Sequence, residues 1–482
     1  MCSYSLAENW EFGICEVNER FRLSRDGEET FVHGRGRPFE PPCRRSLRAG
    51  SVPPNQDLNR RERRQKRTEW GPGCVRARTP APPKSSAFIW DGEQFPTTFG
   101  SLMKGDIESG SEDQNEIVTG LLMDHKGRMK RAQEAFDGAR LDALIVTHLP
   151  SVRYLCGFTG SAGILVINSR ESVFFTDGRY TEQSREEVKA ARIRIEKGKS
   201  VQAGLSNWIN GTRGLRRIGI EAAHLSVADR DGFAKFLPRG AKLVKAPSIV
   251  EQMRMIKDAS EVKLIRNACH LGVKLFDRIR KVVRQGIRES QVAGAIEYEA
   301  RKLGAEQMAF STIIAGGSRS ALPHGRASWA RLPARGFVVC DFGVILAGYC
   351  SDMTRTVHLG RPGVEARAAY EAVKEAQQAA INAVRPGSTL GEVDRAARKL
   401  LYNRRLGKQF THSTGHGLGL EIHEAPRVAA GQNEILRSGM VITIEPGVYL
   451  PGKFGVRIED TVVVTENGCE ILTPCSKEII SI

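Results

Sequence analysis

The sequence predicts two folded parts: an α/β domain over residues 123–250, and an α+β domain over residues 251–482. Two observations support this. From residue 143 to about residue 248, short β-rich runs alternate with helical segments, which is typical of a mixed or parallel sheet. Beyond that point, longer amphipathic helices separate β-rich segments, and these segments carry the polar residues described below. We therefore expect the site of the second part to lie on its sheet.

Residues 1–122 differ in composition from the rest of the chain. They are rich in Pro, Gly and Arg, lack a sustained apolar period, and contain the runs RRERRQKR (60–67) and PAPPKSS (80–86). Such segments cannot bury enough apolar surface to offset the loss of chain entropy. We interpret them as a disordered extension or as an overlong start, with translation beginning at Met123 or Met129.

The charges of the extension balance, with 18 basic and 18 acidic side chains, so the formal excess of +17 lies in residues 123–482. A solvated tail is therefore favoured over a nucleic-acid or membrane tether. The ten cysteines form no CxxC pair, which excludes a zinc knuckle and indicates free thiols. No signal-peptide pattern is present at the start. We expect a cytoplasmic protein without a membrane or nucleic-acid partner.

Five β-rich runs define the sheet of the first part, with a charged helix that ends near residue 191. The runs are ALIVTH (143–148), GILVIN (163–168), SVFFTDGRY (172–180), RIGIEA (217–222) and AKLVKAP (241–247). In the second part, the segment from Ile249 begins a long amphipathic helix, with Asp258 as N-cap, Glu261 three positions later and Gly286 as the stop. Helices are also expected over 364–384 and 390–406.

Three of the ten histidines fall within twelve positions, in the segment THSTGHGLGLEIHE (411–424). His416 lies between two glycines, which would let the backbone approach a metal site, and it is the natural nitrogen ligand. His412 and His423 taken singly would be ordinary structural histidines, but grouped around a metal they could bind substrate or shuttle protons. His324, in ALPHGRAS, is a candidate for the same role.

Four carboxylates in β-rich segments complete the set. Asp341 and Asp352 lie on two runs joined by a turn at residues 347–349, so a hairpin can bring both to one edge of a sheet. Glu445 precedes a Pro-Gly bend, and Glu459 lies in VRIEDTVVV, where an ion pair with Arg457 is the structural alternative to metal ligation. Because several buried carboxylates repel one another, a shared cation is the simplest resolution.

One imidazole and four carboxylates favour hard or borderline divalent ions, such as manganese or cobalt. Two such ions could share a bridging hydroxide that attacks a carbonyl while one ion polarises its oxygen. The sequence offers no alternative nucleophile, because no GxSxG occurs and Cys340 reads as a small strand residue. These residues predict amide hydrolysis by a metal pair.

In order and spacing, these residues resemble the pita-bread metallopeptidases, specifically the aminopeptidase P and prolidase branch. The resemblance covers about residues 129–481 and implies a pita-bread catalytic domain after a smaller creatinase/prolidase-like α/β domain. It implies that Asp341 chelates one metal, that Asp352 and Glu459 bridge both, and that His416 and Glu445 complete the second. The resemblance further implies that Glu445 serves as general base and that His324, His412 and His423 bind substrate and stabilise the tetrahedral intermediate. Arg457, counted with these catalytic residues, matches an arginine of the proline-specific members.

Two segments of the first part strengthen this resemblance. YLCGFTGSAG (154–163) and FFTDGRYTEQ (174–183) are similar to the first domain of bacterial Xaa-Pro peptidases. Methionine aminopeptidases generally lack such a domain and fit poorly. Residues 1–122 have no counterpart in the family.

The resemblance implies an Xaa-Pro aminopeptidase, which releases the residue before a proline in peptide substrates. An Xaa-Pro dipeptidase (prolidase) is the close alternative, and the sequence does not show whether a cation captures a dipeptide's carboxylate. A metal-free pita-bread binding module is the alternative of another class. We expect two divalent ions, with manganese ahead of cobalt or zinc, and by family analogy a homodimer or homotetramer.

Overall fold

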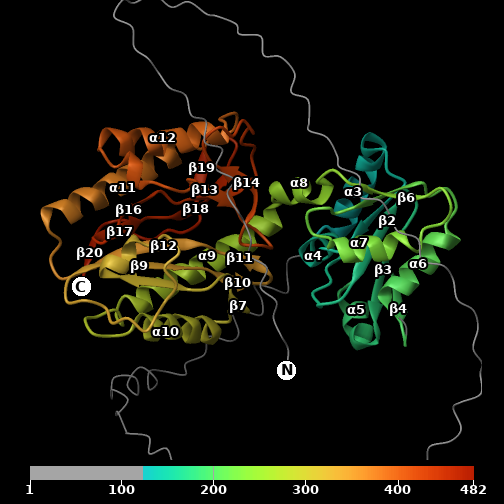
Figure 1. The fold of residues 1–482 in the computed structure, drawn as a ribbon, viewed down its shortest axis with the longest axis horizontal. Coiled ribbons are helices and arrows are strands. Elements are labelled where there is room, and N and C mark those ends of the chain that lie inside the picture. Colours follow the sequence, from blue (N-terminus) through green and yellow to red (C-terminus); the bar gives the residue numbers. More distant parts are fainter. Residues whose placement is uncertain (1–122, 199) are drawn as a thin grey trace, which may run out of the picture. The chain divides into compact units, whose positions relative to one another are not determined.

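The computed structural model describes residues 123–198 and 200–482. The predicted extension, residues 1–122, lies outside the described residues. The first part is the predicted α/β region, with helices on both faces of a six-stranded sheet (Figure 1). Its elements are α3 (His125–Ala139), β1 (Ala143–Val146), α4 (Leu149–Cys156), β2 (Ile164–Asn168), β3 (Ser172–Asp177), η1 (Gly178–Tyr180), α5 (Thr181–Glu187), β4 (Arg192–Glu196), α6 (Val201–Gly211), β5 (Arg217–Ile220), α7 (Val227–Ala234) and β6 (Lys242–Lys245).

The sheet of this region is mixed, with strand order β4-β3-β2-β1-β5-β6. The pairs β1–β2 and β2–β3 are antiparallel, and the other three are parallel. Alternate residues of β1 pack into two separate cores, Leu144 and Val146 on one face, Ala143 and Ile145 on the other, as the two-residue strand period requires. The edge strand β4 was not predicted, because its sequence RIRIE alternates charged side chains with isoleucine and leaves it partly exposed.

The second part holds the remaining elements. They are α8 (Ile249–Met255), α9 (Ala259–Ile279), α10 (Glu289–Lys302), β7 (Gln307–Met308), β8 (Ile313–Gly316), η2 (Gly317–Ala321), β9 (Gly336–Phe342), β10 (Val344–Leu346), β11 (Tyr349–Cys350), β12 (Met353–Leu359), α11 (Val364–Ala383), α12 (Leu390–Asn403), η3 (Gly407–Gln409), β13 (Gly415–Gly417), β14 (Glu424–Val428), β15 (Val441–Ile444), β16 (Gly447–Leu450), β17 (Phe454–Arg457), β18 (Asp460–Val464), β19 (Cys469–Ile471) and β20 (Ile480–Ser481).

Two sheets carry the site, with strand orders β20-β12-β9-β8 and β14-β13-β15-β18-β19. Helices α11 and α12 share one apolar core with strands β15 to β18, and α9 and α10 share another with β8, β9 and β12. Figure 1 shows these two helix pairs on opposite sides of the strands. This is the predicted α+β organisation, with the strands between two helical layers.

The expected long helix from Ile249 is divided into α8 and α9. Between them Ile256 is extended and bridges to Met440, and α9 then begins with the predicted capping box of Asp258 and Glu261. The predicted stop at Gly286 is wrong, because α9 ends at Ile279. Gly286 lies in the following turn, where it has φ +80° and its N–H binds the Leu332 carbonyl.

Helix α12 begins with a capping box formed by Thr389 and Glu392, which satisfies two N–H groups of its first turn. It ends at Asn403, before the predicted residue 406. The predicted hairpin is confirmed: β9 and β12 are antiparallel, and Ala347 and Gly348 make the turn with positive φ. In this register the Cα of Asp341 faces Thr354, so Asp352 lies just beyond the paired end of β12.

Among the described residues, no helix is both long enough and apolar enough to span a membrane. All six cysteines of the described residues are free thiols. Burial raises the pKa of the Cys340 thiol to about 12, so it is protonated at neutral pH and does not act as a nucleophile.

Candidate metal centre

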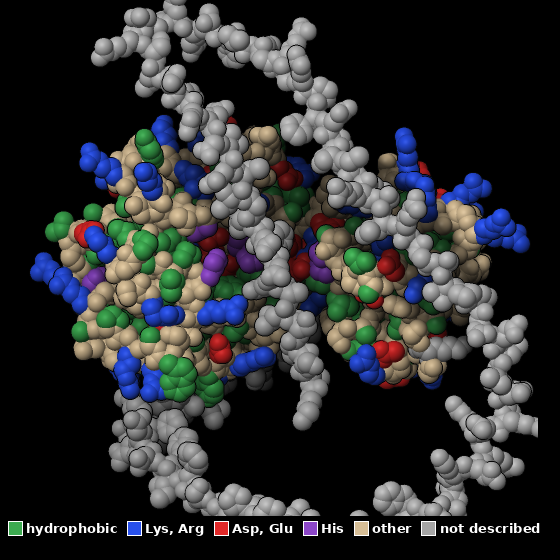
Figure 2. All heavy atoms as spheres, in the orientation of Figure 1, with side chains coloured by type: hydrophobic (Ala, Val, Ile, Leu, Met, Phe, Trp, Pro, Cys, Tyr) green, Lys and Arg blue, Asp and Glu red, His purple; other side chains and the backbone are tan. Residues whose placement is uncertain are grey.

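The structure brings the five predicted ligands together from both sheets and from the ends of strands. Asp341 lies in β9, Asp352 directly precedes β12, and His416 is the middle residue of β13. Glu445 directly follows β15, and Glu459 lies between β17 and β18. Figure 2 shows acidic and histidine side chains close together on one face of this region.

Three of the five form a tight group, since ligand atoms of Asp352, His416 and Glu459 all lie within 4.8 Å of one another. The Nε2 atom of His416 is 3.6 Å from Asp352 Oδ2 and also 3.6 Å from Glu445 Oε1. Asp341 approaches from β9, and its Oδ2 forms an ion pair with Arg457. The group therefore surrounds the imidazole nitrogen with carboxylate oxygens.

The charges of this group do not balance within the described residues. Burial and the neighbouring Glu459 raise the pKa of Asp352 well above its usual range, and burial together with Glu459 does the same for Glu445. Burial, with Asp341 nearby, raises the pKa of Glu459 to about 8. Within the described part of the chain, Asp341 Oδ1 and Asp352 Oδ1 are buried without a hydrogen-bond partner. Divalent cations fit this donor set, because they would satisfy the orphaned oxygens and offset the repulsion.

His416 is held in the tautomer that metal ligation needs. Its Nδ1 lies 3.0 Å from the Gly417 carbonyl, so Nδ1–H donates there and leaves the Nε2 lone pair directed at the carboxylates. Burial lowers the pKa of His416 to about 4, so the ring is neutral at pH 7. The flanking glycines make room for neighbouring strands rather than for the metal, because a Cβ at Gly415 would lie 1.9 Å from the Thr443 carbonyl.

A chain of hydrogen bonds links two predicted catalytic residues. Arg457 donates through Nη1 to the Tyr449 hydroxyl at 2.7 Å, and that hydroxyl lies 3.0 Å from His412 Nε2. His412 Nδ1 lies 2.8 Å from the Ser413 carbonyl, so Nε2 is the acceptor of the Tyr449 proton. Burial and the charge of Arg457 lower the pKa of His412 to about 4. His412 is therefore neutral and fixed in orientation.

The two remaining histidines lie at the rim. His423 meets His416 edge to face, with ring centroids 4.4 Å apart. His324 is exposed and close enough to lower the pKa of both His412 and His423, after the larger effect of burial. All nine predicted site residues thus belong to one neighbourhood, although their individual roles remain predictions.

Three residues near the centre were not predicted from the sequence. Tyr449 connects Arg457 to His412, and Thr354 donates to Glu459 Oε2 at 2.7 Å. Arg427 faces His416 across the β13–β14 ladder, and its side chain is exposed. The predicted alternative pairing of Arg457 with Glu459 is replaced by its ion pair with Asp341. A strand periodicity in EPGVY could have indicated Tyr449, whereas the strand register of Arg427 is not visible in the sequence.

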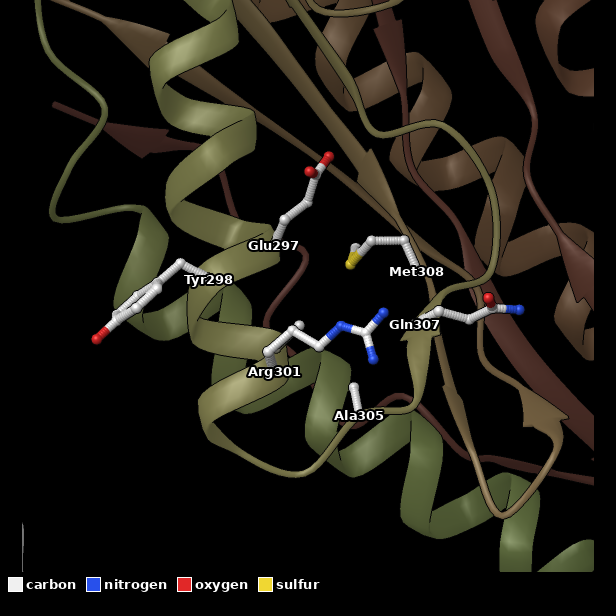
Figure 3. Close-up of a pocket in the computed structure, with 7 residues that line it drawn as sticks. Glu297, Tyr298, Arg301, Ala305, Gln307 and Met308 are labelled. Carbon is white, nitrogen blue, oxygen red and sulfur yellow. The ribbon is translucent and has the colours of Figure 1, made fainter. Parts of the chain in front are cut away.

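A separate hollow of about 350 Å³ lies between α10 and β7 (Figure 3). Its lining contains Glu297, Arg301 and Met308, and none of the predicted site residues. Arg301 extends into it, while the Tyr298 ring points away. The Arg301 guanidinium already donates to the Glu306 carbonyl.

Comparisons with known proteins agree with this geometry. Residues 263–466 match the model of metallopeptidase family M24, and residues 128–256 match that of the creatinase/prolidase N-terminal domain. An Xaa-Pro dipeptidase of Pyrococcus horikoshii is 37% identical over 358 residues, which cover 73% of this chain and 98% of that protein.

Solved structures give the same picture. An Xaa-Pro dipeptidase from Bacillus anthracis aligns with a TM-score of 0.72 at 36% identity, over 74% of this chain and 100% of that one. An X-Pro aminopeptidase from Thermotoga maritima aligns with a TM-score of 0.68 at 35% identity, over 72% and 100%. The predicted pita-bread architecture with a smaller α/β domain before it is confirmed.

Proposed function

Because the chain belongs to metallopeptidase family M24, we propose that it is an Xaa-Pro dipeptidase that hydrolyses the bond before a C-terminal proline. The relatives named above supply the substrate class, and most of those with a stated specificity are dipeptidases or prolidases. The resemblance of the sequence alone implies an aminopeptidase first and a dipeptidase second. Those relatives and Arg427 support the dipeptidase over the aminopeptidase.

The position of Arg427 is the observation that favours a dipeptidase over an aminopeptidase. Directly opposed residues of an antiparallel pair point to the same face, so the Arg427 side chain leaves β14 on the face from which His416 leaves β13. Among the described residues it forms no ion pair with a carboxylate. A dipeptide ends in a carboxylate one residue beyond the scissile bond, and a free guanidinium can bind it bidentately. A longer peptide would place an uncharged amide there.

Asp341, Asp352, His416, Glu445 and Glu459 are the proposed ligands of two divalent cations, with manganese first and cobalt or zinc as alternatives. When bound, the cations would activate water and polarise the scissile carbonyl. Glu445 is the proposed proton acceptor, because its Oε1 lies beside the centre, 3.6 Å from His416 Nε2. Neutral His412 and His423, with His324 at the rim, would hold the substrate by hydrogen bonds.

The test compares Gly-Pro with Gly-Pro-amide and with Arg-Pro-Pro, using manganese-loaded and chelator-treated protein. A dipeptidase cleaves Gly-Pro, loses the activity with chelator, and is much slower on the amide, which lacks the carboxylate. Arg427→Gln should raise KM for Gly-Pro and leave the amide unaffected. Equal rates on the acid and the amide, or no effect of Arg427→Gln, would contradict this assignment.

An Xaa-Pro aminopeptidase is the second candidate, favoured by the similarity to the Thermotoga maritima enzyme. It would cleave Arg-Pro-Pro faster than Gly-Pro. A metal-free binding module would show no chelator-sensitive turnover of any of the three substrates. The cluster of buried carboxylates argues against a metal-free module. Burial and mutual repulsion raise the pKa values of Asp352, Glu445 and Glu459, so their charged forms are unfavourable without cations.

We further propose a cytoplasmic homodimer or homotetramer. The free thiols in the described residues fit a reducing compartment. Light scattering of the purified protein would give its mass, and a monomer would rule out the oligomer.

A further inference from the structure

The segment that carries His423, residues 418–423, has no regular secondary structure, although it connects β13 to β14 beside the centre. We call it the His423 loop. Two of its backbone contacts fix its start: the Cys350 N–H donates to the Gly419 carbonyl at 2.7 Å, and the Gly419 N–H donates to the Glu421 carbonyl at 3.0 Å. The position of His423, four residues beyond Gly419, needs further anchors.

Those anchors are carboxylates on either side of His423. Glu424 Oε1 accepts the Glu421 N–H at 3.0 Å, so the loop closes on the Glu424 side chain. A Cβ at Gly419 would lie 2.8 Å from Glu424 Oε2, which shows how closely the loop backbone packs over this carboxylate. Glu424 directly follows His423 in the chain. A fixed Glu424 side chain therefore holds the end of the His423 loop in place.

Two buried cations hold these carboxylates from outside the loop. Arg254, in α8 and 3% exposed, places Nη2 2.6 Å from Glu421 Oε2 and 2.5 Å from Glu424 Oε1. Lys257, 4% exposed, reaches Glu424 Oε2 at 3.3 Å. Two cations face two carboxylates, so this cluster is balanced, unlike the metal centre. Charge and hydrogen bonds from the two cations outweigh burial and lower the pKa of Glu424.

The backbone around Lys257 is fixed to the segment that leads into β15. Lys257 N–H donates to the Gly439 carbonyl at 2.9 Å, and Ile256 bridges to Met440, which directly precedes β15. Strand β15 leads into Glu445. The short segment 254–257 therefore connects the His423 loop to β15, the strand that directly precedes the proposed ligand Glu445.

We infer that Arg254 and Lys257 are positioning residues, which hold His423 against His416 by clamping Glu421 and Glu424. This inference rests on the proposed function, because His423 acts on substrate only if the centre is a peptidase. Neither cation reaches the ligand atoms of the centre itself. The effect of either residue on turnover should therefore pass through His423.

The experiment is a double-mutant cycle on the manganese-loaded full chain. Arg254→Met and His423→Ala are made singly and together, and kcat and KM for Gly-Pro are measured. Arg254→Met should lower kcat about 10–100-fold, the range seen when a residue that orients an active-site group is removed. In the His423→Ala background the same change should have little further effect, because the two act as a unit.

Arg266→Met is the matched control. It also removes an arginine–glutamate ion pair made by a helix, but its partner Glu470 is half exposed and lies outside the His423 loop. It should leave kcat unchanged. Arg254→Lys, which keeps a cation with a shorter reach, should restore part of kcat. Additive losses from Arg254→Met and His423→Ala would overturn the inference.

Hydrogen exchange separates failure of this inference from failure of the proposed function. In Arg254→Met the peptide covering residues 418–424 should exchange faster, while peptides over β15 and β18 keep their protection. If the wild-type protein cleaved none of the three test peptides, the proposed function would be wrong. Independently of that result, unchanged hydrogen exchange over residues 418–424 in Arg254→Met would reject the positioning role of Arg254. If Arg254→Met does not fold, Glu424→Gln is measured in its place, with the same expected exchange and the same expected non-additivity.

Discussion

Glu459 and Asp460 are neighbours in the sequence and both are buried, yet their carboxylates lie in opposite surroundings. Burial, with Asp341 nearby, raises the pKa of Glu459 to about 8, whereas Arg355 and Lys477 outweigh burial and lower the pKa of Asp460. The difference teaches that the fold can satisfy a buried carboxylate with its own cations. At Glu459 it places other carboxylates instead, which suits a site that receives its positive charge from outside.

The Asp460 cluster is complete without any ligand. Arg355 donates through Nη2 to Asp460 Oδ1 at 2.6 Å, and Gln377 donates to Oδ2 at 2.8 Å. Lys477 lies 3.1 Å from the same Oδ2. Arg355 also donates to the Glu459 carbonyl, so the Asp460 cluster holds the backbone that presents Glu459 to the centre.

The largest expected effect is on stability at the Asp460 cluster. Asp460→Asn leaves the buried Arg355 without its carboxylate, and breaking a buried pair in this way costs about 3–5 kcal/mol. Denaturant unfolding measures the free energy of unfolding. Arg404→Met, which removes a surface pair with Glu375, is the control and should cost less than about 1 kcal/mol. Equal costs at the two positions would show that the buried Asp460 pair contributes no more to stability than a surface ion pair.

At the metal centre, replacing a carboxylate by an amide should mainly reduce catalysis. Glu459→Gln is expected to lower kcat/KM for Gly-Pro on the order of 10²–10³-fold, as for loss of one preorganised electrostatic group. The pKa of Glu459 is raised from an ordinary value of 4.5 to about 8, so at pH 7 the metal-free folded state must either hold a proton that the unfolded state releases or bury a charge, and both cost stability. Glutamine removes this cost, so the metal-free variant should unfold at a higher temperature than metal-free wild type. A less stable metal-free variant would contradict this account of Glu459.

Added manganese should stabilise the wild-type protein, since it binds the folded centre and offsets its repulsion. Free metal at about 100 times its Kd would add about 2.7 kcal/mol. Calorimetry with and without manganese measures the shift, which should nearly vanish in Glu459→Gln at the same metal concentration. Persistence of the full shift in that variant would place the metal elsewhere.

The smallest effect concerns acid stability near the His423 loop. Burial raises the pKa of Glu421, but a hydrogen bond with His148 and the charge of Arg254 outweigh it, and the pKa falls to about 2. A lowered folded pKa gives stability that is fully present above the ordinary value near 4.5 and is lost as the pH falls toward 2. The gap in unfolding free energy between wild type and Glu421→Gln should therefore narrow from pH 5 to pH 3. A constant gap would show that Glu421 is not held by charge.

The sequence by itself determined the order of the two regions, the capping boxes at Asp258 and Thr389, and the set of polar residues in the β-rich segments. These follow from local rules, because helix starts depend on side chains three positions apart and strands on alternation. Glu445 and Glu459 were recognisable because glutamate is rare in apolar strands. The end of α9 was missed, since turn residues after Ile279 bind a distant segment at Leu332.

The tertiary structure alone decided which charges meet. Nothing in the sequence shows that Glu459 and Asp460 have opposite pKa shifts. The pKa of Asp460 is lowered by Arg355, 105 residues before it, and by Lys477, 17 residues after it, whereas the pKa of Glu459 is raised by burial and by Asp341. The pairing of Arg457 with Asp341, the link through Tyr449 and the clamp by Arg254 likewise join residues far apart in the chain. Electrostatic energy depends on distance and burial, and both are set only when the strands pack together.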